Sequence, residues 1–374
     1  MNRFFRLQCA LAVMLAALLA SCATLPPRVP ARIALDREVL DTTLDSELAR
    51  YYANAYRSGR GGDPAMDARL RAALAALPPG MPDRDALREL AQRTSPDVAA
   101  LHLADRLLSD PVNRRFEAVY AAALRSLEAA VPRAGDYRIV FVPGWGYRSA
   151  PGNGADFAAP RAVLSDLGVE TVLVETDENG AVEDNAAVTA RAISDHAAAG
   201  RDLIVVSASK SAAEVGLALS QLGPAAAARV RGWLNVVGIL RGSPLADWAM
   251  SWPRRGLTTV SLATSGFGSD GLASMTTQRS RERFRRLSVP EHVIVVNYIG
   301  IPLSGTISDR AQRNYLRLRG HGPNDGFSLL VDQIYPGGIT LFELGRDHYM
   351  LGADMGARTA ALARTLMDWL DAPG

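Results

Sequence analysis

The residues best suited to chemistry in this sequence surround Ser209, where an apolar run gives way to a helical pattern. Residues 203–206 are four consecutive aliphatic residues, typical of a buried strand, and apolar residues follow at helical spacing over 215–219. The change from strand to helix therefore falls on Ser209, with the small residues Ser207 and Ser211 two positions before and after it. A sharp turn needs such small neighbours, and it directs the first N–H groups of the new helix at whatever lies above the serine. The stretch predicts a serine nucleophile beside an oxyanion site.

Two other interpretations of the stretch stay open. The sequence Ser-Ala-Ser-Lys-Ser is also a common kind of polar helix start, with Ser207 or Ser209 as the N-cap. Residues 207–210 also match Ser-x-x-Lys, the serine–lysine signature of penicillin-binding proteins and related esterases. That signature needs downstream Ser-Asp-Asn and Lys-Thr-Gly segments, and Lys210 is the only lysine in the chain. The sequence therefore favours the turn serine over the serine–lysine pair.

From Tyr137 onward, strand-like and helix-like segments alternate, and this alternation predicts what positions Ser209. Buried strands are expected at 138–142, 169–174, 203–206, 232–237, 258–263 and 293–298, with helices between them such as 158–167, 185–199 and 282–287. The pattern predicts a mainly parallel sheet with helices on both faces. Ligands of such sheets bind beyond the carboxyl ends of the strands, where Trp145 and Ser209 both fall.

The order of these segments resembles the α/β-hydrolases: a strand ending in a small-residue loop, a strand–serine–helix turn, an acid and then a histidine near the C-terminus. Residues 238–247 resemble a stretch of bacterial lipases, 322–326 resemble their Asn-Asp-Gly segment, and 346–349 resemble the segment with their histidine. The resemblance covers roughly residues 137–372. It implies an α/β-hydrolase fold and a bacterial lipase-like or esterase-like serine hydrolase that acts on a small-molecule or lipid ester. The sequence contains no nucleotide-binding or metal-binding motif, so we expect no cofactor and no metal.

The resemblance also assigns roles to residues. Ser209 is the expected nucleophile, His348 the base that takes its proton, and Asp325 the carboxylate that orients the imidazole. The oxyanion hole is expected from the backbone N–H of Lys210 and one from the loop of Gly144 and Trp145. Rival histidines fall in helical patterns, begin a strand or lie in a glycine-flanked loop, and rival acids also exist: His102, His196, His292, His321, Asp309 and Asp332.

Departures from the family pattern leave alternatives open. Pro143 stands where many relatives have histidine, and Ile239 and Leu240 replace a proline and a histidine of the lipases. Serine replaces glycine on both sides of Ser209, which adds bulk at a crowded turn. A non-catalytic descendant of the fold and an amidase or peptidase with the same triad therefore remain alternatives to an esterase.

The N-terminus predicts export and anchoring. Two arginines precede the apolar run 11–19, which is too short to span a bilayer comfortably, and residues 19–22, Leu-Ala-Ser-Cys, resemble the lipobox of bacterial lipoproteins. We expect a signal peptide at 1–21, a lipid on Cys22 and a location at the outer membrane, because Ala23 rather than aspartate follows the cysteine. A plain secretory signal is the alternative.

The remaining organisation follows from composition and spacing. Residues 22–40 are rich in proline and are expected to be a tether, 41–132 an all-helical N-terminal region, and 133–374 the hydrolase domain. Aspartate or serine precedes each helix-starting segment, at Asp63, Asp83, Ser95 and Asp110. A formal net charge of +2, without interleaved basic and aromatic residues, gives no indication of nucleic acid binding. The segment with Trp248 and Trp252 is expected to be a lid or acyl-binding wall, or equally a short core helix.

Overall fold

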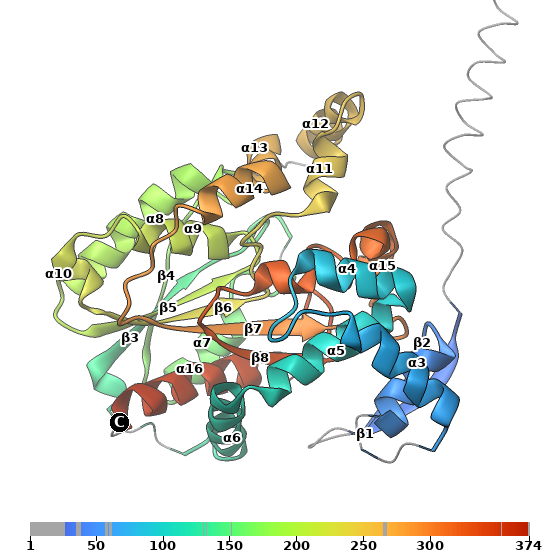
Figure 1. The fold of residues 1–374 in the computed structure, drawn as a ribbon. Helices are drawn as coiled ribbons and strands as arrows, with labels where there is room; N and C mark the ends of the chain where they lie inside the picture. The colour runs from blue at the N-terminus through green and yellow to red at the C-terminus, as the bar shows by residue number, and fades with distance from the viewer. Residues whose placement is uncertain are drawn as a thin grey trace, which may run out of the picture.

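A computed structural model describes residues 27–34, 39–56, 59, 62–129, 131, 133–150, 152–264, 268–352 and 354–372. The predicted signal peptide and Cys22 lie outside these residues. The centre of the molecule is a parallel sheet of six strands in the order β4-β3-β5-β6-β7-β8 (Figure 1). The strands are β3 (Tyr137–Val142), β4 (Glu170–Leu173), β5 (Asp202–Ala208), β6 (Val230–Val236), β7 (Ile294–Ile301) and β8 (Ile339–Leu344). The predicted parallel sheet is confirmed.

Both faces of the sheet are buried, which explains the continuous apolar runs of its central strands. Ile139 and Phe141 of β3 pack with α6 (Pro111–Arg125), α7 (Ala158–Asp166) and α16 (Met355–Asp371), whereas Val140 and Val142 face the other way. That second face is covered by α8 (Val182–Ala197) and α9 (Ser211–Leu219), with α10 (Pro224–Ala227) and α14 (Thr277–Phe284) at its margin (Figure 1). Side chains alternate between the faces because successive residues of a strand point in opposite directions.

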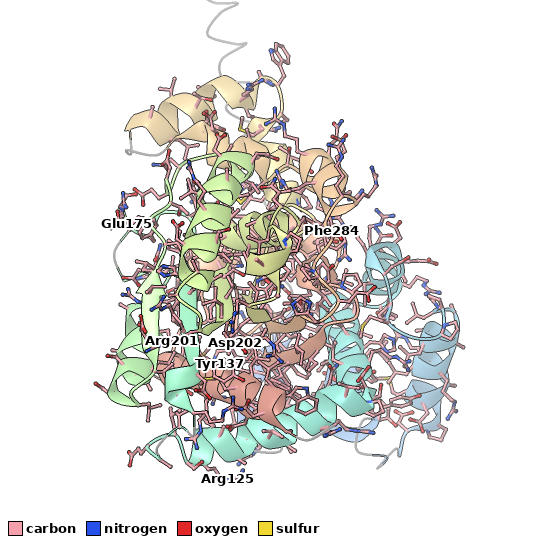
Figure 2. The ribbon with its side chains drawn as sticks, turned by 90° about the vertical axis from the view of Figure 1, so that its left-hand side faces the viewer. Arg125, Tyr137, Glu175, Arg201, Asp202 and Phe284 are labelled. Carbon is pink, nitrogen blue, oxygen red and sulfur yellow. The ribbon has the colours of Figure 1, made fainter. Side chains whose placement is uncertain are left out.

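The amino-terminal edge of the sheet is charged and lies opposite the serine. Figure 2 shows Tyr137, Arg201 and Asp202 grouped where β3 and β5 begin. The Tyr137 hydroxyl donates to Asp371 at 2.8 Å, and Asp202 accepts from Arg231 at 2.9 Å. Hydrogen bonds and ion pairs thus connect the residues at this edge of the sheet.

The first described residues of the N-terminal region form strands, where a tether and then helices were predicted. Strands β1 (Val29–Ala34) and β2 (Val39–Leu44) form an antiparallel pair, so neither an extended tether through residue 40 nor an entirely helical region is correct. The hairpin forms because alternate residues of β1, Ala31 and Ile33, are buried. Helices follow it: α2 (Glu47–Tyr51), the π-helix η1 (Tyr52–Tyr56), α3 (Pro64–Ala75), α4 (Arg84–Arg93), α5 (Pro96–Ser109) and α6. The four predicted capping residues each accept a hydrogen bond from the first turn of their helix.

This N-terminal region shares one core with the sheet. Leu101 and Leu103 of α5 lie in the same buried cluster as Ile299 and Ile301 of β7 and Leu344 of β8. Asp97 of α5 also accepts hydrogen bonds from the Ser304 backbone and hydroxyl, at 2.9 and 3.0 Å. The region therefore supports the edge of the sheet from which the acid and histidine loops leave.

One predicted strand is wrong. Residues 258–263 belong to the helix α12 (Arg254–Thr264), which follows α11 (Pro244–Met250) and projects from the top of the molecule in Figure 1. No gap exists for a strand there, because β6 pairs directly with β7. The remaining helices of the described chain are α13 (Ser269–Ser274), α15 (Asp309–Leu318) and the short 3-10 turns η2 (Ala134–Asp136), η3 (Arg319–His321) and η4 (Leu330–Gln333). In the described ranges no helix combines the length and apolarity needed to cross a bilayer.

Candidate active site

Ser209 lies on a strained turn between β5 and α9. Its backbone φ is +56°, a left-handed conformation that residues other than glycine rarely adopt. The turn is held from both sides, because the Ser209 N–H donates to the Val236 carbonyl at 3.0 Å and the Ser209 carbonyl accepts from Ile239 N–H at 2.9 Å. Such strain persists only where surrounding contacts fix it, and it is concentrated at functional sites.

The two serines that flank Ser209 are structural. The Ser207 hydroxyl accepts a hydrogen bond from the Trp233 indole at 2.8 Å, and Ser207 is fully buried. The Ser211 hydroxyl donates to the Val142 carbonyl at 2.7 Å and accepts from the Ala208 N–H at 2.9 Å. The extra bulk compared with glycine is therefore accommodated by hydrogen bonds to β3 and β6. Because Ser207 is buried and already bonded, the serine–lysine alternative is not supported.

His348 connects Ser209 to Asp325. Its Nε2 lies 2.9 Å from the Ser209 hydroxyl, and its Nδ1 lies 2.6 Å from Asp325 Oδ2. Asp325 is fully buried and His348 is 8% exposed. The three predicted residues thus meet although they lie on three separate loops, after β5, after α15 and after β8. The imidazole can pass a proton between the serine and a reacting group while the carboxylate holds its orientation.

The Asp325 loop holds the carboxylate rigidly. Asp325 Oδ1 accepts from the Phe327 and Ser328 N–H groups, each at 2.8 Å, and Oδ2 accepts from the Gln333 side chain at 2.9 Å. Phe327 stacks on the His348 ring with centroids 4.7 Å apart. Gln333 and Phe327 were not predicted from the sequence, and only the position of Phe327 close to Asp325 in the chain indicated a role for it.

Gly144 has a different role from the predicted one. Its N–H donates to the Ala155 carbonyl at 2.9 Å, so it is not available to an oxyanion. A Cβ at this position would lie 3.2 Å from the Ala208 carbonyl and 3.8 Å from Ser209 Cβ, which shows that the loop after β3 passes directly over the turn. Lys210, at the N-cap of α9, presents a backbone N–H that no carbonyl within the helix accepts. Lys210 and Trp145 remain the predicted oxyanion donors.

No protein-family model and no curated protein matches the chain. Among solved structures, the metagenomic carboxyl esterase MGS0156 aligns with a TM-score of 0.52 at 22% identity, over 65% of this chain and 77% of that one. The mature Bacillus licheniformis lipase BlEst2 aligns with a TM-score of 0.50 at 21% identity, over 65% of this chain and 94% of that one. The chain has an α/β-hydrolase fold. Similarity at this identity concerns the fold and not the activity.

Within this α/β-hydrolase fold the rival residues lie elsewhere. His292 Nε2 lies 3.0 Å from the Ala227 carbonyl, and His321 is exposed on a 3-10 turn. Burial lowers the pKa of both His102 and His196, and His196 Nδ1 lies 3.2 Å from Arg138. Asp332 accepts from Arg84 Nε at 2.8 Å, and Asp309 is exposed in the first turn of α15. Among the residues that the structure describes, only Asp325 and His348 form a hydrogen-bonded series with Ser209.

A cavity of about 810 Å³ adjoins the relay and is lined by both Ser209 and His348. Most of its remaining wall is apolar and comes from helices and loops around the carboxyl edge of the sheet, including Phe157, Ile239, Leu245, Leu262, Met275 and Met355. An apolar cavity with a few convergent polar groups is the usual form of a small-molecule site. The arrangement can hold an acyl chain with its carbonyl at the serine.

The expected pocket tryptophans do not line this cavity. The first turn of α11, with Leu245 and Ala246, faces it instead. Trp248 lies on another side of the helix, with the Arg317 guanidinium 3.7 Å from its ring centroid, and Trp252 is 90% exposed. The segment contributes to the cavity wall through Leu245 and Ala246 and not through the two expected tryptophans.

Proposed function

We propose that this chain is a serine hydrolase that cleaves carboxylic esters, of the esterase or lipase kind, through an acyl-enzyme on Ser209. The observation that carries the proposal is the hydrogen-bonded series from Asp325 through His348 to Ser209, at 2.6 and 2.9 Å, beside an apolar cavity. The two solved structures with a similar fold are named as a carboxyl esterase and a lipase, and the proposed reaction is of the same class.

In the first half of the proposed reaction, His348 Nε2 takes the proton of the Ser209 hydroxyl while Oγ attacks the ester carbonyl carbon. The tetrahedral oxyanion accepts hydrogen bonds from the backbone N–H groups of Lys210 and Trp145. The imidazolium then gives its proton to the leaving alkoxide oxygen, the ester C–O bond breaks, and the acyl group stays on Ser209.

In the second half, water replaces the alcohol. His348 takes a proton from the water as its oxygen attacks the acyl carbon, and the same N–H groups hold the second oxyanion. Return of the proton to Ser209 Oγ breaks the acyl–serine bond and releases the carboxylic acid. Asp325 keeps the imidazole in one tautomer throughout and stabilises its positive charge.

The test is the variant Ser209→Ala, assayed with p-nitrophenyl esters of short and medium acyl chains. We expect kcat to fall by at least about 10³-fold, because the nucleophile is lost while the cavity remains. A fluorophosphonate probe should label wild-type protein and not the variant. The control is Ser165→Ala, an exposed serine on α7, which should keep full activity. Full activity of Ser209→Ala would refute the proposal, and amide substrates in the same panel separate an esterase from an amidase.

We also propose that the mature chain is held in the bacterial cell envelope, at the outer membrane, by a lipid on Cys22. The support is the sequence of residues 19–22 after a short apolar run, together with Ala23. Wild-type protein should incorporate labelled palmitate and sediment with membranes, whereas Cys22→Ser should do neither. Equal labelling of the two proteins would contradict this location.

A further inference from the structure

The only lysine of the chain lies directly after Ser209 and is buried. Lys210 is 2% exposed, and its ammonium forms an ion pair with Glu214, which is 1% exposed and one turn further along α9. Burial raises the pKa of Glu214, and the charge of Lys210 acts in the opposite direction. Removing two charges from water is costly, and a pair within one helix connects no separate elements by itself. Stability alone therefore does not explain why the ion pair of Lys210 and Glu214 lies beside the turn of Ser209.

Glu214 carries the pair to a neighbouring helix. The Glu214 oxygen that accepts from Lys210 also accepts from the Asn185 side chain of α8, at 2.9 Å. Asn185 is 2% exposed and holds both backbone groups of Asp177: its Nδ2 donates to the carbonyl at 2.7 Å, and its Oδ1 accepts from the N–H at 3.2 Å. The ion pair thus fixes the loop between β4 and α8.

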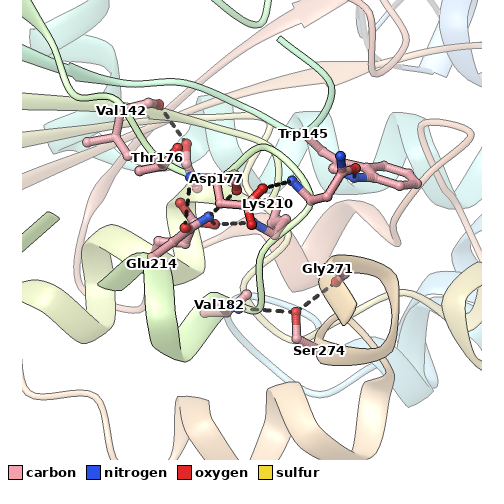
Figure 3. A network of polar contacts seen from close by, with 12 residues as sticks. Val142, Trp145, Thr176, Asp177, Val182, Lys210, Glu214, Gly271 and Ser274 are labelled. Carbon is pink, nitrogen blue, oxygen red and sulfur yellow. Dashed lines mark hydrogen bonds and ion pairs between the residues drawn. The ribbon is translucent and has the colours of Figure 1, made fainter. Parts of the chain in front are cut away.

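This loop in turn reaches the other side of the site. Asp177 Oδ1 accepts from the Asn179 N–H at 2.9 Å, and Asn179 Oδ1 accepts from the Trp145 indole at 3.3 Å. The Asn179 carbonyl also accepts from the Gly271 N–H at 2.9 Å, and a Cβ at Gly271 would lie 3.3 Å from Lys210 Cε. Figure 3 shows Lys210, Glu214, Asp177 and Trp145 in this one network, with Gly271 and Ser274 of α13 below it.

The two ends of the network are the residues whose backbone N–H groups are expected to hold the oxyanion. Lys210 is the N-cap of α9 and Trp145 follows β3, so the two donors adjoin different elements. Donors of this kind must already be placed where the oxygen will lie in the transition state, and a displacement of about 1 Å can cost about 10²-fold in rate.

We propose that Lys210, Glu214 and Asn185 are positioning residues that fix the spacing of the oxyanion hole through their side chains. The inference rests on the proposed function, because it concerns the same reaction. The side chains act through the backbone of Lys210 and through Trp145, and the Asp325–His348–Ser209 relay is separate from them.

Two variants test the positioning role. Asn185→Ala disconnects the ion pair from the Asp177 loop, and the double variant Lys210→Met/Glu214→Met removes both charges while it keeps apolar volume, which often leaves stability unchanged. In each variant we expect kcat for an ester to fall about 10- to 100-fold, with KM changed less than about threefold. The reason is that the backbone N–H groups bind the oxyanion only in the transition state. The alkaline and acid limbs of the pH profile should stay in place, since the relay is intact.

The control is Glu183→Gln, also on α8, which weakens the ion pair with Arg283 but leaves the network. It should change the melting temperature and not kcat. Wild-type kcat in a folded Asn185→Ala or double variant would overturn the positioning role, and so would a rise in KM that accounts for the whole loss of kcat/KM. An inactive wild type would instead refute the proposed function, so the two failures are distinguishable.

Discussion

The turn at Ser209 has a serine on each side, where related turns have glycine. The hydroxyl groups of these two serines explain why the turn accepts them. Ser207 and Ser211 were grounds for expecting a degenerate site when only their size was considered. Each hydroxyl instead takes part in a buried hydrogen bond, Ser207 with Trp233 and Ser211 with Val142 and Ala208. The sequence predicted that Ser209 would occupy the turn. It could not predict the hydrogen bonds of Ser207 and Ser211, because their partners include residues of β3 and β6.

Ser211→Ala tests this structural role. The change leaves the Val142 carbonyl and the Ala208 N–H without their hydroxyl partner in a buried place, and each unpaired group costs about 1 to 3 kcal/mol. We expect the free energy of unfolding, measured in urea, to fall by about 1 to 3 kcal/mol for each of these two groups, with a smaller effect on activity. Ser165→Ala, on an exposed face, serves as the control. Unchanged stability of Ser211→Ala would show that the turn does not depend on this hydroxyl.

Helices and strands were predictable from sequence where burial on both faces leaves a continuous apolar run. Residues 203–206 are such a run, and β5 is the strand found there. Residues 258–263 are instead rich in β-branched residues, which favour strands, and they form α12. Val260 is 64% exposed on this helix, so local preference was the only signal and no buried face was present to correct it.

The loop after β3 shows what spacing can and cannot predict about an element. Its place above Ser209 follows from the parallel sheet, because β3 and β5 are neighbours whose carboxyl ends lie at one edge. Which of its N–H groups is available does not follow, since the partner of Gly144 is Ala155, eleven residues later. The meeting of Ser209, Asp325 and His348 was predictable because the resemblance to the α/β-hydrolases gives their order along the chain. The contact of Gln333 in η4 with Asp325, and those of Asn185 in α8 with Asp177 and Glu214, had no such signal in the sequence.

Across the whole molecule, the N-terminal region is joined to the hydrolase fold by a buried acidic pair. Asp97 Oδ2 accepts from the Asp45 N–H at 2.8 Å, and the Arg319 guanidinium lies 3.1 Å from Asp45. Arg319 stands shortly before the Asp325 loop, so the pair connects β2, α5 and the segment that carries the acid. Sequence patterns could not predict the contact between Arg319 and Asp45, because the two residues are 274 positions apart.

Burial and the nearby Asp45 raise the pKa of Asp97 to about 8, from an ordinary value of 3.8. Between pH 3.8 and about pH 8 the Asp97 carboxyl keeps its proton in the folded chain and has lost it in the unfolded chain. Asp97 therefore stabilises the folded state at low pH, and this contribution to the free energy of unfolding is lost as the pH rises to about 8. We expect the free energy of unfolding to carry a falling component between about pH 5 and pH 8, measured by urea denaturation. Asp97→Asn cannot titrate and should remove this component, while the absolute stability of the variant is less informative, because its amide meets the Asp45 N–H. The same slope in both proteins would mean that Asp97 is ionised in the folded state, with Arg319 rather than a proton balancing the acidic pair.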